Sequence, residues 1–106
     1  MIPFVTINLD KHYKLRFGMG AQIEFEQLTH MKLGQLAREL EHDPSIEIMG
    51  KALWIMMRRE NKALTLEDVC ELVDQHADNL TYIVESVSNA IEIAWEVKDR
   101  PNAPTP

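Results

Sequence analysis

The feature that most constrains the fold of this chain is one change in hydrophobic periodicity, at residues 18–20. Before it, apolar and polar residues alternate over residues 4–9 and again over residues 13–17, with polar residues 10–12 between the two runs. Such alternation is typical of strands with one packed face and one solvated face. After it, apolar residues recur every three or four positions to residue 98, as they do along helices. An isolated two-stranded hairpin is marginally stable in water, so we expect this one to pack on the helices.

The sequence therefore predicts a mainly α fold, a small helical domain of four or five helices with an N-terminal antiparallel β-hairpin over about residues 4–17. A chain of 106 residues can bury roughly 60–70% of the surface that it exposes when unfolded, which is enough for a core without crosslinks. We expect one domain over residues 1–99. An extended Pro-rich tail follows over residues 100–106, where three residues are proline.

The first helices are expected at about residues 20–29 and 33–40, with either a kink or a break at residues 29–32. Ile23, Phe25 and Leu28 are the apolar residues of the first helix. Pro44 ends this region, because the residue before a proline avoids helical geometry. The third helix is expected to run to about residue 59, and its middle is apolar almost all round.

Two polar residues mark the starts of the last two helices, at about residues 65–76 and 79–98. Thr65 can cap the first of them, although Asp68 stands where a capping box prefers Glu or Gln. Asn79 is a good cap for the second. The apolar residues expected on one face of the last helix are Leu80, Ile83, Val84, Val87, Ile91, Ala94 and Trp95.

The net negative charge of the chain disfavours partners that are themselves negatively charged. With 17 acidic and 11 basic side chains, the chain has a net charge of −6 at pH 7, which repels nucleic acid and anionic membranes. A single cysteine cannot form an internal disulfide, which favours a reducing compartment. No secretory signal is visible, and the longest apolar stretch, at residues 52–57, is far shorter than the ~20 residues of a membrane span. We expect a soluble, intracellular protein without nucleic-acid or membrane partners.

Residues that could carry catalysis or bind a metal are scattered along the sequence. The four histidines lie in four different segments, and no pair has the i,i+4 spacing of a helical zinc site. Cys70 lies six residues before His76, on a different face of one helix. We therefore expect a buried structural cysteine rather than a nucleophile. Clusters of carboxylates are typical of solvated helix faces. We expect no enzyme activity, no cofactor and no metal.

One helical segment has more apolar residues than a single core-facing stripe needs. Trp54, Ile55, Met56 and Met57 follow one another in the middle of the third helix. Methionine fills irregular cores, and it is also frequent at adaptable binding surfaces. Core packing is the favoured interpretation for most of this segment, with Trp54 or Ile55 pointing elsewhere. The alternative is a partner-binding patch, and its candidate residues are Trp54, Ile55, Met56 and Met57.

Four segments, in this order, carry a resemblance to a known family. They are INLDKHYKLRF at residues 7–17, IEFEQLT at 23–29 with Leu33 and Leu36 after it, ALW at 52–54 leading to LTLEDV at 64–69, and residues 80–95. Together they resemble the hairpin, first helix, middle helices and closing helix of the tail assembly chaperones of long-tailed bacteriophages. These small proteins are encoded just before the tape-measure protein.

The resemblance implies a role without catalytic residues. In that family the chaperone holds the long, aggregation-prone tape-measure protein soluble while tail-tube subunits polymerise around it. It thus implies a host-cytoplasmic location, absence from the mature virion, and the tape-measure protein and tail-tube subunits as partners. We also expect a homo-oligomer, because self-association is one way to cover an exposed apolar patch.

The alternative hypothesis is a small helical DNA-binding transcriptional regulator. In it, residues 65–76 and 79–98 form a helix-turn-helix whose second helix contacts the bases. Glu85, Glu92 and Glu96 on the exposed face of that helix weigh against this hypothesis, since DNA phosphates repel carboxylates.

Overall fold

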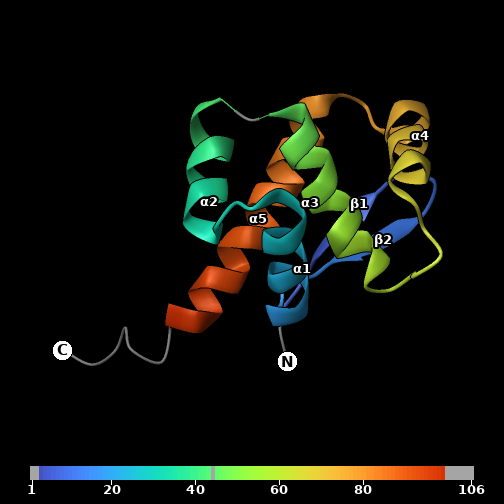
Figure 1. The fold of residues 1–106 in the computed structure, drawn as a ribbon. Helices are drawn as coiled ribbons and strands as arrows, with labels where there is room; N and C mark the ends of the chain where they lie inside the picture. Colours follow the sequence, from blue (N-terminus) through green and yellow to red (C-terminus); the bar gives the residue numbers. More distant parts are fainter. Residues whose placement is uncertain (1–2, 44, 100–106) are drawn as a thin grey trace.

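The computed structural model describes residues 3–43 and 45–99, which form two strands and five helices (Figure 1). In chain order these are β1 (Val5–Asn8), β2 (His12–Leu15), α1 (Met19–Thr29), α2 (Leu33–His42), α3 (Ile46–Arg58), α4 (Leu66–His76) and α5 (Leu80–Asp99). The predicted fold class, mainly helical with an N-terminal antiparallel hairpin, is confirmed. The expected Pro-rich tail at residues 100–106 lies outside the described residues, as do the side chains of Leu33 and Trp95.

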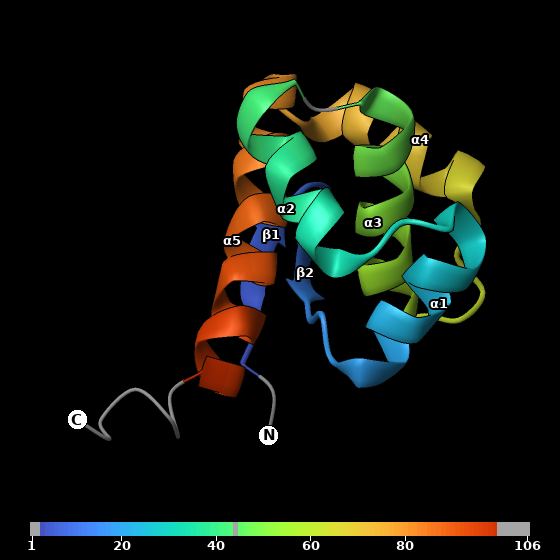
Figure 2. The ribbon, with the colours of Figure 1, turned by 60° about the vertical axis from the view of Figure 1, so that its left-hand side comes forward.

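The hairpin forms because its two strands turn apolar residues to the same side. In the antiparallel register Ile7 pairs with Tyr13, and Ile7, Leu15 and Phe17 are buried. This confirms the packed face predicted from the alternating sequence. Strand β1 contacts α5 and strand β2 contacts α3, so the hairpin leans on two helices that are far apart in the sequence (Figure 2).

Helix α3 lies at the centre of the core. It contacts α1, α4, α5 and β2, and both ribbon views show other elements on several of its sides (Figures 1 and 2). Ser45 begins the helix, because its hydroxyl accepts a hydrogen bond from the Ile48 N–H at 3.3 Å. Side chains around most of the helix axis are buried, namely Met49, Ala52, Leu53, Ile55, Met56 and Met57.

Helix α1 has apolar residues on two faces. Ala21 and Phe25 are buried, and Phe25 packs edge-on against Phe17 with 6.0 Å between the ring centroids. Ile23 is 52% exposed and Leu28 is 41% exposed, so two of the three apolar residues noted in this helix lie outside the core. A step of two residues turns a helix by about 200°, which places Ile23 opposite both Ala21 and Phe25.

Helix α1 ends at Thr29 and α2 begins at Leu33, so the sequence forms two separate helices here rather than one kinked helix. His30 has a left-handed backbone with φ of 58°, and its N–H donates to the Glu26 carbonyl at 2.7 Å. The Thr29 hydroxyl donates to the Phe25 carbonyl at 2.7 Å and accepts from the Met31 N–H at 3.2 Å. These bonds satisfy the end of α1 and redirect the chain into α2.

Side-chain caps begin α4 and α5 as predicted. The Thr65 hydroxyl accepts from the Asp68 N–H, and the Asp68 carboxylate accepts from the Thr65 N–H, both at 3.0 Å. The capping box is therefore complete, because the shorter Asp reaches the backbone where Glu or Gln is usual. Asn79 caps α5 by accepting from the Tyr82 N–H at 3.0 Å.

The predicted face of α5 is buried in the body of the helix, but Leu80, which was predicted to lie on it, is 50% exposed because it stands at the first position of the helix. Ile83, Val87 and Ile91 are all at most 2% exposed. The Tyr82 hydroxyl accepts a hydrogen bond from the Asn8 N–H at 2.8 Å, which fixes the hairpin to this helix. None of the described helices combines the length and the apolar character that crossing a bilayer demands.

Candidate protein-binding surface

The four residues predicted to bind a partner differ in their exposure to solvent. Ile55, Met56 and Met57 are at most 1% exposed and belong to the hydrophobic core. The expectation of an exposed patch is therefore wrong for these three, because neighbouring elements enclose α3. Trp54 is the member of the four that reaches the surface, and it is half-buried. The favoured interpretation, core packing for most of this segment, agrees with the structure.

Trp54 holds the turn that follows α3. Its indole N–H donates to the Leu64 carbonyl at 2.9 Å, and the Arg58 guanidinium lies over its ring, 5.3 Å from the centroid. Arg58 also forms an ion pair with Glu24 of α1. A series of contacts thus connects α1 through α3 to Leu64 and fixes the position of the Leu64 backbone.

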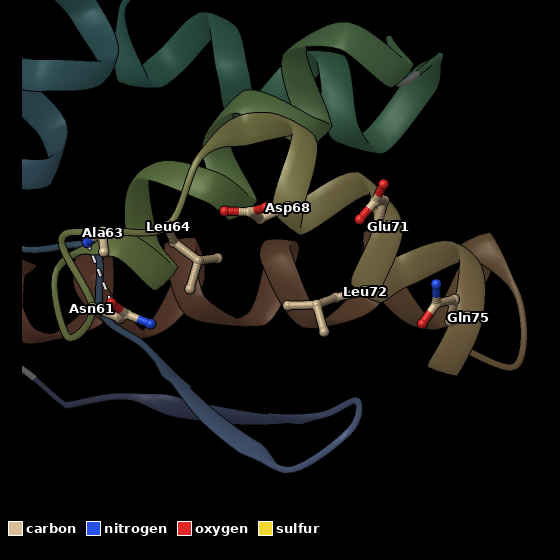
Figure 3. Close-up of a pocket in the computed structure, with 7 residues that line it drawn as sticks. All are labelled: Asn61, Ala63, Leu64, Asp68, Glu71, Leu72 and Gln75. Atoms are coloured by element: carbon tan, nitrogen blue, oxygen red, sulfur yellow. Dashed lines mark hydrogen bonds between the residues drawn. The ribbon is translucent and has the colours of Figure 1, made fainter.

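Residues 61–64 and α4 enclose a surface hollow of about 320 Å³, here called the α4 hollow (Figure 3). Figure 3 shows Leu64 and Leu72 on one side of it and the carboxylates of Asp68 and Glu71 on the other. Both leucines are half-buried and pack on the core. The residues that line the hollow are Asn61, Ala63, Leu64, Asp68, Glu71, Leu72 and Gln75.

The rim of the α4 hollow is acidic. The Asp68 carboxylate is engaged in the helix cap with the Thr65 N–H. Glu71 lies one turn further along α4 and takes part in none of the ion pairs formed within residues 3–43 and 45–99. Glu67 and Asp74 add exposed carboxylates to the same helix. The hollow therefore combines an apolar floor with a negative edge whose Glu71 is available to a partner.

A second hollow of about 230 Å³ lies beside the first, and Asn61 lines both. We call this second hollow the hairpin hollow, and its unpaired charges are positive. Lys11 and Lys14 form no ion pair with any described residue, whereas Glu60 is paired with Arg16 at 2.9 Å. The residues that line it are Lys11, His12, Tyr13, Lys14, Met57, Glu60 and Asn61. Two neighbouring hollows thus have edges of opposite charge.

Tyr13 gives the hairpin hollow a neutral aromatic wall. Lys11 lies over its ring, 5.6 Å from the centroid, and its hydroxyl donates to the Asp10 carboxylate at 2.6 Å. Burial, followed by this hydrogen bond, raises the pKa of Tyr13 to about 12. The same bond is the main cause that lowers the pKa of Asp10 below its ordinary 3.8. Near neutral pH, Tyr13 is therefore a phenol beside a carboxylate.

The residues considered for chemistry do not come together in the described part of the chain. No group of three or more His, Cys, Asp and Glu residues there could hold a metal ion. Cys70 is exposed, so the prediction of a buried cysteine is wrong. Val69 is the buried residue of α4, and the next residue lies about 100° further round the helix, on the solvent side.

The sequence did not predict the α4 hollow, because its walls come from a turn and from a helix that pack together only in the fold. One signal was present, since Leu64 is an apolar residue in the otherwise polar connection between two helices. Leu72, on the helix that follows this connection, is half-buried beside the hollow.

Comparison with known proteins gives no assignment. No protein-family model, no curated protein and no solved structure matches this chain.

Proposed function

We propose that this protein is a non-enzymatic tail assembly chaperone, which binds the tape-measure protein and keeps it soluble while tail-tube subunits assemble. The observation that carries the proposal is the position of the α4 hollow. Leu64 and Asp68, which line it, belong to the LTLEDV segment that resembles the family. Trp54, which holds Leu64 in place, belongs to the resembling ALW segment.

The hollow suits a chaperone because such a protein needs accessible apolar surface and must also remain in solution. Leu64 and Leu72 supply the apolar floor, and the acidic rim together with the net charge of −6 opposes aggregation. Met19 and Ile23, one turn apart on the outer side of α1, are exposed as well. An amphipathic helix of a client would bury its apolar face on surfaces of this kind.

The proposal includes the partners and location that the resemblance implies. The protein acts in the host cytoplasm, contacts tail-tube subunits as well as the tape-measure protein, and is absent from the mature virion. A homo-oligomer is part of the same proposal, with self-association covering apolar surface before the client binds.

The alternative, a DNA-binding regulator, has less support. Helix α5 would be its recognition helix, but α5 buries Ile83, Val87 and Ile91 in the core. Its exposed side carries Glu85 and Glu92. A recognition helix projects into the major groove with side chains that contact phosphates and base edges, and these carboxylates would be repelled.

The test is co-expression with the tape-measure protein of the same phage. We expect the wild-type chain to raise the soluble fraction of the tape-measure protein severalfold, and the Leu72→Ser variant to lose this effect. Leu80→Ser is the matched control, since Leu80 is an exposed leucine at the first position of α5. Circular dichroism establishes that both variants are folded.

The outcomes test two claims separately, namely the chaperone function and the α4 hollow as the binding surface. If the tape-measure protein is equally insoluble with and without the wild-type chain, the proposed function is wrong. If the wild type and both variants raise its solubility equally, the function stands and the α4 hollow is not the binding surface.

A further inference from the structure

We propose that the α4 hollow and the hairpin hollow together recognise one amphipathic helix with separated charges, its basic residues facing α4 and its acidic residues facing the hairpin. This inference deepens the proposed function, on which it rests for the claim that the occupant is a segment of another protein. It specifies the chemistry of that segment, which the function alone leaves open.

The two hollows form one continuous surface. Asn61 lines both hollows, so a bound segment can lie across its side chain from one hollow into the other. Apolar surface is present on both sides of it. Leu64 and Leu72 line the α4 hollow, and Tyr13 lines the hairpin hollow. A helix with apolar residues at i, i+3 or i+4, and i+7 presents one continuous apolar stripe to such a surface.

Charged side chains at both ends of this surface are available to a bound segment. Glu71 at one end and Lys11 and Lys14 at the other form no ion pairs among the described residues. The ammonium groups of Lys11 and Lys14 lie over the rings of Tyr13 and Phe4, and each can also donate to a carboxylate because an ammonium has three N–H donors. These are the charges that an occupant can complement.

The opposite charges of the two hollows make the surface selective for the charge pattern of a bound segment. A segment with one sign of charge along its whole length would be attracted at one hollow and repelled at the other. A segment with basic and acidic blocks satisfies both hollows at once. Complementary charges of this kind mainly determine orientation and association rate, and they are weakened by salt. The apolar stripe of the occupant then supplies most of the affinity.

The experiment uses two synthetic amphipathic peptides of about 18 residues, long enough for several helical turns. Both have the same leucine stripe and the same numbers of Lys and Glu. In the blocked peptide, Lys occupies one half and Glu the other, whereas in the scrambled peptide the two alternate. Binding to the full chain is measured by isothermal titration calorimetry at about 50 mM and about 500 mM salt.

We expect the blocked peptide to bind at least about threefold more tightly than the scrambled peptide at low salt, and the two to become equal at high salt. Glu71→Gln and Lys14→Gln should each weaken the blocked peptide by about threefold. Glu85→Gln is the matched control, because it removes the same charge from the exposed side of α5. We expect this control to bind as the wild type does.

Equal binding of the two peptides at low salt would overturn the inference, and so would equal effects of Glu71→Gln and Glu85→Gln. Sedimentation of the chain alone tests the other occupant. If Glu71→Gln dissociates a homo-oligomer and the peptide does not compete with it, the surface belongs to a second copy and the inference is wrong. If the peptide experiment gives this result but the chain still keeps the tape-measure protein soluble, the inference is wrong and the proposed function stands. If the blocked peptide binds as expected but the chain does not keep the tape-measure protein soluble, the proposed function is wrong and the inference about the surface stands.

Discussion

At the scale of single residues, Trp54 links the core to the candidate surface, and the value of that link can be measured. Trp54→Phe keeps an aromatic ring and removes the N–H that donates to the Leu64 carbonyl. We expect a loss of about 1 kcal/mol in the free energy of unfolding, the typical net contribution of such a hydrogen bond. Urea titration gives the value. A change below about 0.3 kcal/mol would show that water replaces the bond without cost.

The Tyr13–Asp10 pair predicts how the hairpin responds to pH. The pKa of Tyr13 is raised to about 12 from 10.0, so its contribution to stability is complete below pH 10 and is lost as the pH rises toward 12. The pKa of Asp10 is lowered, so its contribution is present above pH 3.8 and is lost as the pH falls through the lowered pKa.

Removing the phenol separates these two effects. We expect Tyr13→Phe to eliminate the tyrosine that titrates near pH 12 in an absorbance titration. The pKa of Asp10, followed by NMR, should rise toward 3.8 because its main stabilising hydrogen bond is gone. An unchanged pKa of Asp10 in this variant would mean that the Tyr13 bond does not form in solution.

At the scale of elements, α5 contributes to the core through one stripe of side chains. Ile91→Ala should lower the free energy of unfolding by about 2–5 kcal/mol, through lost burial and the cavity left behind. Leu80→Ala on the same helix is the control, because Leu80 is half exposed, and it should cost much less. Guanidinium titration of both variants provides the comparison. Equal losses of unfolding free energy in the two variants would mean that Ile91 does not lie on the buried face of α5.

Two helical glycines should respond differently to alanine. A Cβ at Gly50, inside α3, meets no atom within 4 Å, so Gly50→Ala should stabilise the protein by about 0.5–1 kcal/mol through helix propensity. A Cβ at Gly20 lies 2.7 Å from Arg59 Nη2, and this flexible side chain must move away. Gly20→Ala should therefore gain less. Thermal unfolding ranks the two, and a larger gain at Gly20 would contradict the argument.

Local pattern predicted the elements that are decided locally. The alternating residues gave the hairpin and the face that contains Ile7 and Leu15, and the hydroxyl of Thr65 and the amide of Asn79 marked two helix starts. The enclosure of α3 depends on elements from both ends of the chain, and no local pattern contains that information. For this reason the sequence left Ile55 open between core and surface, and it predicted a buried Cys70 where the fold leaves this residue exposed.

At the scale of the whole molecule, the fold brings together two segments that are about fifty residues apart in the sequence. Residues 11–14 and residues 61–75 line neighbouring hollows with opposite charge. In the sequence these are only two short charged stretches, each typical of a solvated surface. Their relation arises because the hairpin packs against α3 and α5, and residues 60–61, just after α3, line the same hollow as residues 11–14.

The whole-molecule charge also predicts that this protein does not bind DNA. With a net charge of −6, the chain should not retard a duplex in a gel-shift experiment even at about 50 mM salt, where phosphate contacts are strongest. The double variant Glu85→Lys/Glu92→Lys reverses the charge on the exposed side of α5 and is the informative comparison. If α5 were a recognition helix, the wild type would retard DNA and the variant would do so more strongly. Retardation by the wild type that persists at about 150 mM salt would favour the regulator hypothesis over the chaperone, because specific base contacts survive the screening that removes weak phosphate attraction.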